Sequence, residues 1–562
     1  MKDIIEDIVR KYALKNAKEY GKAEMGAVIG KVIAEIPNAK KEISKIMPVI
    51  KKVIGEVNAL TTEQIDTEVK RYTFEEKKVE ERHVKLPPPT DNVVTRFAPE
   101  PSGYLHLGHA KAVFLAHEAK KEYGGKFYLR LDDTNPELAK QEYVDAIKQD
   151  LNWMGITWDA EEFSSDFMGL FYEYATELIK KGGAYVCDCT PELVKLNRRE
   201  RKECSCRRKA IKPNITDFEK MIGDEFKEGK VIVRFMGNMK SQNSVMRDPT
   251  LMRINKKEHF RQGDKYVAWP TYDFATPILD SIRGISHAMR SKEYELRDEL
   301  YFAVLDALGL NKPQVVSFSR LEIKNNPTSK RVLRELVQKK LVSGWDDPRL
   351  LTIQGLRRRG FLAEAIREFG LSFGMGKAES KEATLEPLIV ESRKLFDPVS
   401  KRLFFVKDPI VLEIKGYSKK VSIPFHSEKE PGTREFIIDE KLFVDKNDIE
   451  IGDTVRLKDL CTVKIEKKDK GSAEATVIET DKIPEKKIQW IPFDAFVNVE
   501  VLKPGDLLTE DKINKNSLIT FNGYAEKAAE QLKDGEVVQF IRFGFVKLDK
   551  KESDKLTFIF TA

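Results

Sequence analysis

The chain has 562 residues, 34% of them charged and 41% hydrophobic, and its 98 Lys and Arg exceed its 91 Asp and Glu by a formal net charge of +7. Because one domain usually holds about 100–200 residues, this length excludes a single core and predicts roughly three to five domains. No apolar run approaches the roughly 18 residues of a transmembrane helix, which excludes a membrane-spanning protein. The abundant aromatic residues exclude a wholly disordered chain.

The N-terminal region, residues 1–85, places apolar residues at helical spacing, as in Ile5, Ile8 and Val9. This periodicity predicts amphipathic helices. The first residues are charged and lack the apolar segment of a secretory signal, so we expect a cytoplasmic protein. The segment Val84–Asn92 contains three consecutive prolines and predicts a linker to the next domain.

After this linker, segments typical of strands alternate with segments typical of helices. An apolar strand over Val93–Phe97 and a turn over Pro99–Gly103 lead into a helix, followed by a strand over Lys126–Asp133 and a helix over Glu142–Met154. The alternation predicts an α/β fold with a parallel sheet. From about Phe396 the chain becomes short strand-like runs separated by Gly, Asp, Asn and Lys, which predicts β-barrels.

Two histidines lie where the first of these α/β helices should begin. In PEPSGYLHLGH, His106 and His109 are three residues apart and therefore share one face of the first helical turn. A helix N-terminus suits a phosphate, two imidazoles add hydrogen-bond donors, and Gly108 permits close approach to the backbone. The tetrapeptide alone is equally compatible with two surface histidines.

A basic loop follows the apolar strand predicted over Gln314–Phe318. It carries Ser329, Lys330 and Arg331 after a proline-containing turn. A lysine on such a loop is a mobile point charge that can hold a triphosphate as charge builds in a transition state. Taken alone, the same three residues are more often ordinary solvated surface.

Four of the five cysteines form two Cys-x-Cys pairs, Cys187 with Cys189 and Cys204 with Cys206. In a reducing compartment such clustering favours a metal over disulfides, and four thiolates suit structural, tetrahedral Zn²⁺. Free or regulatory thiols are the alternative. Cys461 stands alone in a strand-like segment and is expected to be a buried small hydrophobe.

The most basic part of the chain surrounds the second cysteine pair. The segment Lys195–Lys212 contains nine Lys and Arg against two Glu, a local charge of +7. A further run occurs at Arg357–Arg359. Both suit the phosphates of an RNA, although a solvated charged loop is the simpler alternative.

Considered together, these motifs resemble those of class I aminoacyl-tRNA synthetases. RFAPEPSGYLHLGHAKAVF resembles the HIGH motif in its glutamyl/glutaminyl branch, and NNPTSKRVL resembles the KMSKS loop, with Lys330 at the position of the second lysine. FYLRLDDTNPELAKQEY, WPTYDFATPILDSIRGISHAMRSKEY and GWDDPRLLTIQGLRRRG extend the resemblance. The β-rich C-terminal region, including Gln539–Asp549, is similar to the anticodon-binding barrels of glutaminyl and of archaeal or eukaryotic-type glutamyl enzymes.

The resemblance implies a multidomain α/β protein built on a Rossmann-like nucleotide-binding catalytic domain, with an inserted acceptor-binding domain, helical regions and C-terminal β-barrels. The expected divisions are a helical N-terminal extension over 1–85, a first catalytic half over 93–186, an inserted acceptor-end-binding domain with a zinc knuckle over 187–265, a second catalytic half with the lysine loop over 266–332, a helical stem-contact domain over 333–395 and two anticodon-binding barrels over 396–562.

The resemblance also implies roles for individual residues. Catalysis is expected from His106, His109 and Lys330. ATP, used with Mg²⁺, is expected to bind at Pro99, Glu100, Pro101, Ser102, Gly103, His106, Gly108, His109, Arg320, Leu321, Ser329 and Lys330. The amino acid is expected at Arg96, Asp132, Tyr272 and Arg290. Zn²⁺ is expected at the four clustered cysteines, and tRNA at Arg207, Arg208, Arg357, Arg358 and Arg359.

Arg290 separates the two substrates of the branch, because glutamyl enzymes have an arginine there and glutaminyl enzymes do not. A guanidinium matches the side-chain carboxylate of glutamate and would be left unpaired by glutamine. The alternative is a surface salt bridge to Glu293 or Glu295. We therefore expect ATP-dependent ligation of L-glutamate to tRNA(Glu) through a glutamyl-adenylate. A glutaminyl enzyme, an enzyme that also charges tRNA(Gln) with glutamate, and an inactive tRNA-binding protein on the same fold are the alternatives.

Overall fold

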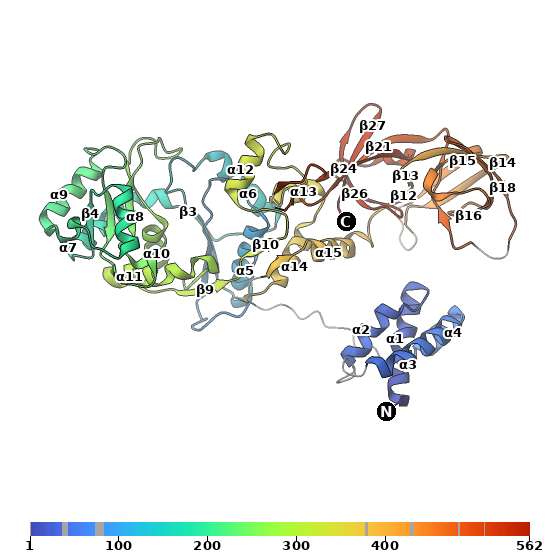
Figure 1. Cartoon of the computed structure of the whole chain (residues 1–562), viewed down its shortest axis with the longest axis horizontal. Coiled ribbons are helices and arrows are strands. Elements are labelled where there is room, and N and C mark those ends of the chain that lie inside the picture. Colours follow the sequence, from blue (N-terminus) through green and yellow to red (C-terminus); the bar gives the residue numbers. More distant parts are fainter. Residues whose placement is uncertain are drawn as a thin grey trace. The chain divides into compact units, whose positions relative to one another are not determined.

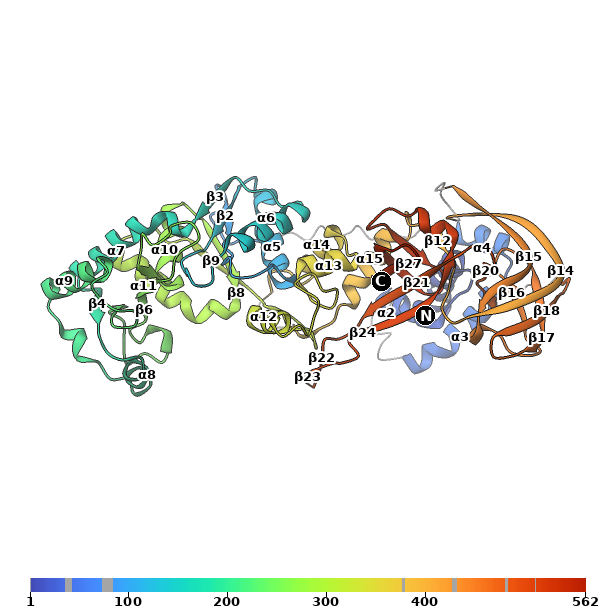
Figure 2. The same ribbon diagram turned by 90° about the horizontal axis from the view of Figure 1, so that it is seen from above.

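The computed structural model describes residues 2–35, 43–72, 84–376, 380–426, 432–480, 484–510 and 512–562. The chain divides into two compact units, Met1–Glu81 and Arg82–Ala562. Figures 1 and 2 show them from two directions. No helix among the described residues is both long enough and apolar enough to span a membrane.

The first unit is helical, as its periodicity predicts. Its apolar side chains form one core, with Val9, Ala13 and Ala17 on the inward face of the first helix. Thr61 caps the last helix through a capping box with Gln64, which satisfies two backbone N–H groups that a helix start leaves without partners. The helices are α1 (Lys2–Tyr20), α2 (Met25–Glu35), α3 (Ile43–Asn58) and α4 (Thr62–Val69).

The second unit begins with a parallel three-stranded sheet in the order β1-β2-β3, which confirms the predicted α/β alternation. The parallel pair β8–β9 continues beside β1, where the amide of Ser286 donates to the carbonyl of Val94 at 3.0 Å. These elements are β1 (Val94–Phe97), α5 (Leu107–Tyr123), β2 (Lys126–Leu131), α6 (Gln141–Trp153), β3 (Ala160–Phe163), β8 (His287–Ser291) and β9 (Gln314–Phe318).

An insertion separates β3 from β8. It contains an antiparallel sheet in the order β4-β5-β6-β7, and this sheet shares a core with the helices around it. The two helices that follow it in the chain, α10 and α11, pack into the same core and return to β8 and β9. The elements are the 3₁₀ helix η1 (Ser164–Phe167), α7 (Met168–Lys180), β4 (Ala184–Cys187), α8 (Pro191–Glu200), η2 (Ser205–Arg208), α9 (Ile211–Ile222), β5 (Ile232–Phe235), η3 (Ser244–Met246), β6 (Thr250–Ile254), β7 (Ala268–Pro270), α10 (Tyr272–Ile282), η4 (Lys292–Arg297) and α11 (Asp298–Leu308).

A helical segment follows the parallel sheet. Helix α14 packs against α5, so this segment shares the core that surrounds β1 and β2. The start of α5 is held by the same segment, because the amide of Leu107 donates to the carbonyl of Leu351 at 2.9 Å. The elements are β10 (Leu321–Ile323), α12 (Lys330–Gln338), α13 (Ile353–Arg359), α14 (Ala363–Ser372), β11 (Ser380–Ala383) and α15 (Glu386–Phe396).

The C-terminal region forms two barrel-like sheets of seven strands each, as predicted. One has the order β19-β16-β17-β18-β14-β15-β20 and contains β14 (Pro409–Pro424), β15 (Thr433–Asp445), η5 (Lys446–Asp448), β16 (Thr454–Leu457), β17 (Thr462–Lys468), β18 (Ser472–Val477), β19 (Lys487–Ile488) and β20 (Ile491–Pro492). The other has the order β12-β25-β26-β27-β21-β24-β13 and contains β12 (Arg402–Leu403), β13 (Phe405–Val406), β21 (Phe496–Pro504), β24 (Leu518–Glu526), η6 (Lys527–Gln531), β25 (Val537–Phe540), β26 (Gly544–Lys551) and β27 (Lys555–Phe560).

A short hairpin between β21 and β24 of the second sheet contacts the segment that precedes Lys330, where the amide of Leu508 donates to the carbonyl of Asn325 at 2.9 Å. It consists of β22 (Leu508–Thr509) and β23 (Lys512–Ile513), and Figure 2 shows it beside α12. Just before it, Asp506 accepts hydrogen bonds from the side-chain amides of Asn325 (2.9 Å) and Asn326 (3.1 Å). Leu507 packs in the core below α12. The barrel region thus contacts the chain directly before Lys330.

A buried ionic network joins β1 and β2 to α10. Asp280 on α10 is fully buried and accepts from Arg96 on β1, at 3.0 Å to each carboxylate oxygen, and from Arg130 on β2 at 2.7 Å. Tyr301 on α11 donates to it at 3.0 Å. The pKa of Asp280 is lowered because Arg96 and Arg130 outweigh the cost of burial. The carboxylate therefore stays charged.

We predict that Asp280→Asn destabilises the protein by about 3–5 kcal/mol, since it leaves the buried Arg96 without its counter-ion and leaves Arg130 with Glu162 alone. The measurement is the urea dependence of unfolding. Because the folded pKa is below the ordinary one, this stabilisation is complete above about pH 4 and is lost as the pH falls further. Asp306→Asn, which removes an exposed partner of Lys312, is the control, and equal loss in both variants would contradict the prediction.

Candidate active site

The two predicted histidines lie at the start of α5. His106 is the N-cap, its Nδ1 accepting from the amide of Gly108 at 3.1 Å, and His109 Nδ1 accepts from the amide of His106 at 3.2 Å. The ring centroids are 3.7 Å apart. Burial lowers the pKa of His106 to about 3 and that of His109 well below its ordinary value, so both rings are neutral near pH 7. Since each Nδ1 accepts, each Nε2 carries the proton and can donate.

Gly108 is required by this arrangement. A Cβ at this position would lie 3.0 Å from the ring of His106, closer than ordinary contacts allow. The start of α5 therefore offers a ligand two imidazole N–H groups and a backbone without a side chain at Gly108.

A cavity of about 390 Å³ adjoins the start of α5. It contains most of the residues expected to bind ATP or the amino acid: Arg96, Pro99, Glu100, His106, Gly108, His109, Tyr272, Arg290, Arg320, Leu321, Ser329 and Lys330. A second cavity, of about 540 Å³, shares Glu100, Tyr272 and Tyr294 with the first and contains Asp132. The sequence-predicted residues therefore converge on two adjoining cavities.

Lys330 is held more firmly than a mobile loop residue would be. It is the first residue of α12, and its Nζ donates to the carbonyl of Glu100 at 2.8 Å and to Ser102 Oγ at 3.3 Å. Arg334, one helical turn later, donates to the carbonyl of Ser102 at 2.6 Å. Burial lowers the pKa of Lys330 to about 8. Pro101, Ser102 and Gly103 therefore form the turn against which Lys330 packs.

Asp132 follows β2 and faces the second cavity. Thr134 Oγ1 donates to its Oδ1 at 3.3 Å. Burial and the nearby carboxylate of Glu100 raise the pKa of Asp132 to about 6, while Arg130 lowers it. A carboxylate in such a place gains from an incoming ammonium group.

Arg290 on β8 is buried, with 5% of its surface exposed. Its Nη1 donates to Tyr272 Oη at 3.3 Å, its Nη2 pairs with Asp298, and its guanidinium lies 4.7 Å from the ring centroid of Tyr301. Asp298, rather than Glu293 or Glu295, is therefore its acidic neighbour. Its buried Nε has no hydrogen-bond partner among the described residues, so it retains a donor for a ligand.

Lys111 on α5 is a further residue of the site, and no motif in the sequence indicates it. This side chain is 1% exposed and lines the cavity that contains the histidines. Its Nζ donates to the carbonyl of Ser319 at 2.6 Å and to Ser319 Oγ at 2.9 Å, and it lies over the rings of Phe318 and Phe373. Burial lowers its pKa to about 8. The only signal in the sequence was its place two residues after His109.

The four clustered cysteines meet as their spacing predicts. All four sulfurs lie within 4.8 Å of one another, with Sγ–Sγ distances of 3.9 Å for Cys187–Cys204 and 3.6 Å for Cys189–Cys206. A tetrahedral zinc with Zn–S bonds of about 2.3 Å would separate its sulfurs by about 3.8 Å. The cluster can therefore hold a metal ion. Cys461 lies apart in the core of a barrel.

The five arginines expected to contact RNA lie in different surroundings. Arg208 and Arg357 are exposed. Arg207 is paired with the buried Asp248, Arg358 with Asp549, and Arg359 is buried with its Nε donating to the carbonyl of Phe560 at 3.3 Å. The last three are thus tied into the fold.

Two further basic residues have a more suitable position: Arg198, which belongs to the basic segment Lys195–Lys212, and Arg253, which the sequence did not indicate. Arg198 and Arg253 line both the cavity that contains Asp132 and a further cavity of about 640 Å³ beside Cys187 and Cys189. These two arginines, called here the basic wall, therefore lie between the cysteine cluster and the cavity that contains Asp132.

Comparison with known proteins agrees with this geometry. Residues 92–396 match the model for tRNA synthetases class I (E and Q), catalytic domain, and residues 400–481 and 487–549 match two anticodon-binding domains of the same group. A glutamate–tRNA ligase of Nitrosopumilus maritimus is 43% identical over 98% of this chain and 99% of its own length. One of Sulfurisphaera tokodaii is 38% identical over 99% of each.

A solved glutamate tRNA ligase from Elizabethkingia meningosepticum, in complex with its amino acid, is 18% identical, with a TM-score of 0.41 over 55% of this chain and 70% of that one. The sequence matches alone are decisive, and the chain belongs to the class I tRNA synthetases of the E and Q group. Members of this class use ATP.

We predict that Lys111→Met raises the KM for ATP about tenfold and leaves the KM for the amino acid unchanged, since it removes charge-assisted hydrogen bonds that fix Ser319 beside the cavity. Pyrophosphate exchange with tRNA present is the measurement. Lys121→Met, on the exposed face of the same helix, is the matched control. An unchanged KM for ATP in Lys111→Met would show that this lysine serves stability alone.

Proposed function

We propose that this protein is a glutamate–tRNA ligase that forms glutamyl-adenylate from ATP and L-glutamate and transfers the glutamyl group to tRNA(Glu). The observation that carries the proposal is the buried Arg290, which lines a cavity that also contains Tyr272 and adjoins Asp132, and whose Nε has no hydrogen-bond partner among the described residues. A buried guanidinium favours a carboxylate side chain over a neutral amide. The proposed place of action is the cytoplasm.

In the first step, the α-carboxylate of glutamate attacks the α-phosphorus of ATP and pyrophosphate leaves. The carboxylate of Asp132 would hold the substrate ammonium, and Arg290 its side-chain carboxylate. The Nε2–H groups of His106 and His109 would donate to phosphate oxygens, and Lys330 would balance their charge. Bound Mg²⁺ would neutralise the triphosphate, and Glu100 and Glu293 are the carboxylates that line the same cavity.

In the second step, a terminal ribose hydroxyl of tRNA attacks the activated carbonyl and AMP leaves. The basic wall that contains Arg198 and Arg253 supports a path for the acceptor end toward Asp132. Phosphate contacts of this kind fix register rather than read sequence. The exposed Arg208 and Arg357 are the better candidates for such contacts among the predicted arginines.

Pyrophosphate exchange with tRNA present tests the substrate. We expect glutamate to be preferred over glutamine by at least about a hundredfold in kcat/KM, because the neutral amide of glutamine offers the buried Nε–H of Arg290 no charged acceptor. Arg290→Gln should lose most of this preference, whereas the exposed Arg393→Gln should keep it. Exchange with glutamine alone would identify a glutaminyl enzyme. No exchange with either would identify an inactive tRNA-binding protein. Charging of purified tRNA(Glu) and tRNA(Gln) in parallel then defines the tRNA range.

We also propose that Cys187, Cys189, Cys204 and Cys206 bind a structural Zn²⁺. The Sγ–Sγ distances match those of a tetrahedral site, and all four ligand positions would come from the protein, which leaves no open position for catalysis. When bound, the ion would staple α8 and η2 to the edge of the insertion's sheet.

Metal analysis of the purified protein should find stoichiometric zinc. Cys206→Ser should lose it and lower the thermal stability of the insertion, because a ligand is removed. Cys461→Ser, which changes a cysteine outside the cluster, should retain it. A wild-type protein with intact thiols and no bound metal would refute the zinc proposal.

A further inference from the structure

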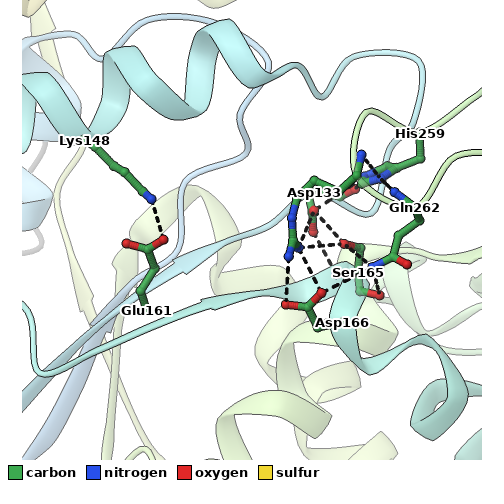
Figure 3. Close-up of polar contacts among 8 residues, drawn as sticks. Asp133, Lys148, Glu161, Ser165, Asp166, His259 and Gln262 are labelled. Carbon is green, nitrogen blue, oxygen red and sulfur yellow. Dashed lines mark hydrogen bonds and ion pairs between the residues drawn. The ribbon is translucent and has the colours of Figure 1, made fainter.

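A group of polar side chains joins the strand end that carries Asp132 to a turn of the insertion. The turn runs from His259 to Gly263 and is closed by backbone hydrogen bonds of 2.9 and 2.8 Å between these two residues. It lies between β6 and β7. In Figure 3, His259 and Gln262 from this turn point toward Asp133, Ser165 and Asp166. We call this group the latch.

The centre of the latch is Asp133. Its side chain is fully buried, and it accepts hydrogen bonds from the amide of Ser165 at 2.8 Å and from Ser165 Oγ at 2.7 Å. Ser165 belongs to η1, which directly follows β3. The neighbouring residue, Asp132, faces the cavity instead. The two adjacent carboxylates therefore differ in their surroundings: that of Asp132 lines the cavity, and that of Asp133 belongs to the latch.

His259 contributes one defined hydrogen bond. Its Nδ1 accepts from the amides of Arg261 at 3.2 Å and Gln262 at 3.1 Å, so Nε2 carries the proton and donates to the carbonyl oxygen of Asp133 at 2.9 Å. The ring is buried and stacked on Trp269, with centroids 4.9 Å apart. The main chain of Asp133 is thus held by a rigid group of the insertion.

The rest of the turn holds η1. Gln262 Nε2 donates to the carbonyl of Ser165 at 3.2 Å and reaches Asp166 Oδ1 at 3.3 Å. Arg261 donates to Asp166 Oδ1 at 2.9 Å and lies 3.6 Å from the ring centroid of Phe163. These contacts tie the end of β3 to the same turn that holds the end of β2.

The latch lies next to the cavity that would receive both the amino acid and the acceptor end. One wall of this cavity is Asp132, Thr134 and Asn135, and another is Arg198, Thr250 and Arg253 of the insertion. The first wall begins directly before and after Asp133, and in the second Thr250 and Arg253 lie on β6, the strand that leads into the turn, while Arg198 lies on α8. A change in the latch would therefore change the separation of the two walls.

We infer that His259 and Gln262 are positioning residues, which hold Asp132 at a fixed place relative to the basic wall of the insertion. This inference rests on the proposed function, since it assigns the glutamate ammonium to Asp132. Orientation of this kind acts on the substrate held by Asp132 and not on the nucleotide, whose cavity lies beyond Glu100.

His259→Ala should raise the KM for glutamate about tenfold in pyrophosphate exchange with tRNA present, and should change the KM for ATP less than about twofold. His259→Gln, which keeps a donor near the position of Nε2, should restore most of the loss. Gln262→Ala, at a half-buried position, should act in the same direction by about threefold and serves if His259→Ala fails to fold. Lys148→Ala is the matched control, since its exposed ion pair with Glu161 joins α6 to β3 outside the latch.

A fall in kcat at unchanged KM for glutamate, in both His259→Ala and Gln262→Ala, would overturn the inference and leave a role in packing alone. Amide hydrogen exchange separates this failure from failure of the proposed function, because it needs no substrate. The latch requires faster exchange over residues 131–135 in His259→Ala than in wild type or Lys148→Ala. If the wild type shows no pyrophosphate exchange with glutamate, the proposed function fails. If the amides of residues 131–135 exchange no faster in His259→Ala than in the wild type, the latch itself is overturned.

Discussion

The buried carboxylate of Asp280 is the constraint on which the geometry of the site depends. It joins Arg96 on β1 and Arg130 on β2 to the helix that begins with Tyr272. Arg96 also donates at 2.8 Å to the carbonyl directly before Arg290. Because each of these charges would be costly to bury alone, the packing of α10 against β1 and β2 has to bring them together in this register. That register brings the histidines, the tyrosine and the arginine to one cavity.

A second constraint acts on the other side of the site. The Asp280 network fixes the nucleotide-binding sheet, but the insertion leaves that sheet after β3 and returns only at α10. Without further contacts, its basic wall could shift relative to Asp132. The turn that contains His259 supplies such contacts at the ends of β2 and β3. The network thus acts beside Arg290 and the latch beside Asp132, the two residues that would hold glutamate, and fixed positions of this kind are what catalysis by orientation requires.

The parts of the site that depend on local spacing could be predicted from the sequence. His106 and His109 cap α5, and the four cysteines converge, because three-residue and two-residue spacings determine which side chains face each other. Lys111 could not be recognised, because its partner Ser319 lies 208 residues away. The same holds for Asp280. Tertiary contacts of this kind leave no periodic signal.

Even where a residue was foreseen, its partner often was not. The sequence offers Glu293 and Glu295 as salt-bridge partners of Arg290, yet the acid that pairs with it is Asp298 at the start of α11. Lys330 was expected on a mobile loop, whereas α12 begins with it and the turn at Glu100 holds its ammonium group. Residue identity follows from the motif, but the electrostatic surroundings follow from which elements the fold packs against it.

The basic segment Lys195–Lys212 shows the same difference between residue identity and electrostatic surroundings. Its local charge of +7 was counted from neighbouring residues only. In the structure, Arg207 pairs with Asp248 and Lys209 with Asp217, two acids outside the segment. Part of this basic charge therefore holds the cysteine cluster against the insertion's sheet. Fewer Lys and Arg side chains of the segment remain available for phosphate than the net charge of +7 implies. Since the salt dependence of RNA binding follows the number of phosphates neutralised and not the number of basic residues, the contribution of this segment should be smaller than its nine Lys and Arg indicate.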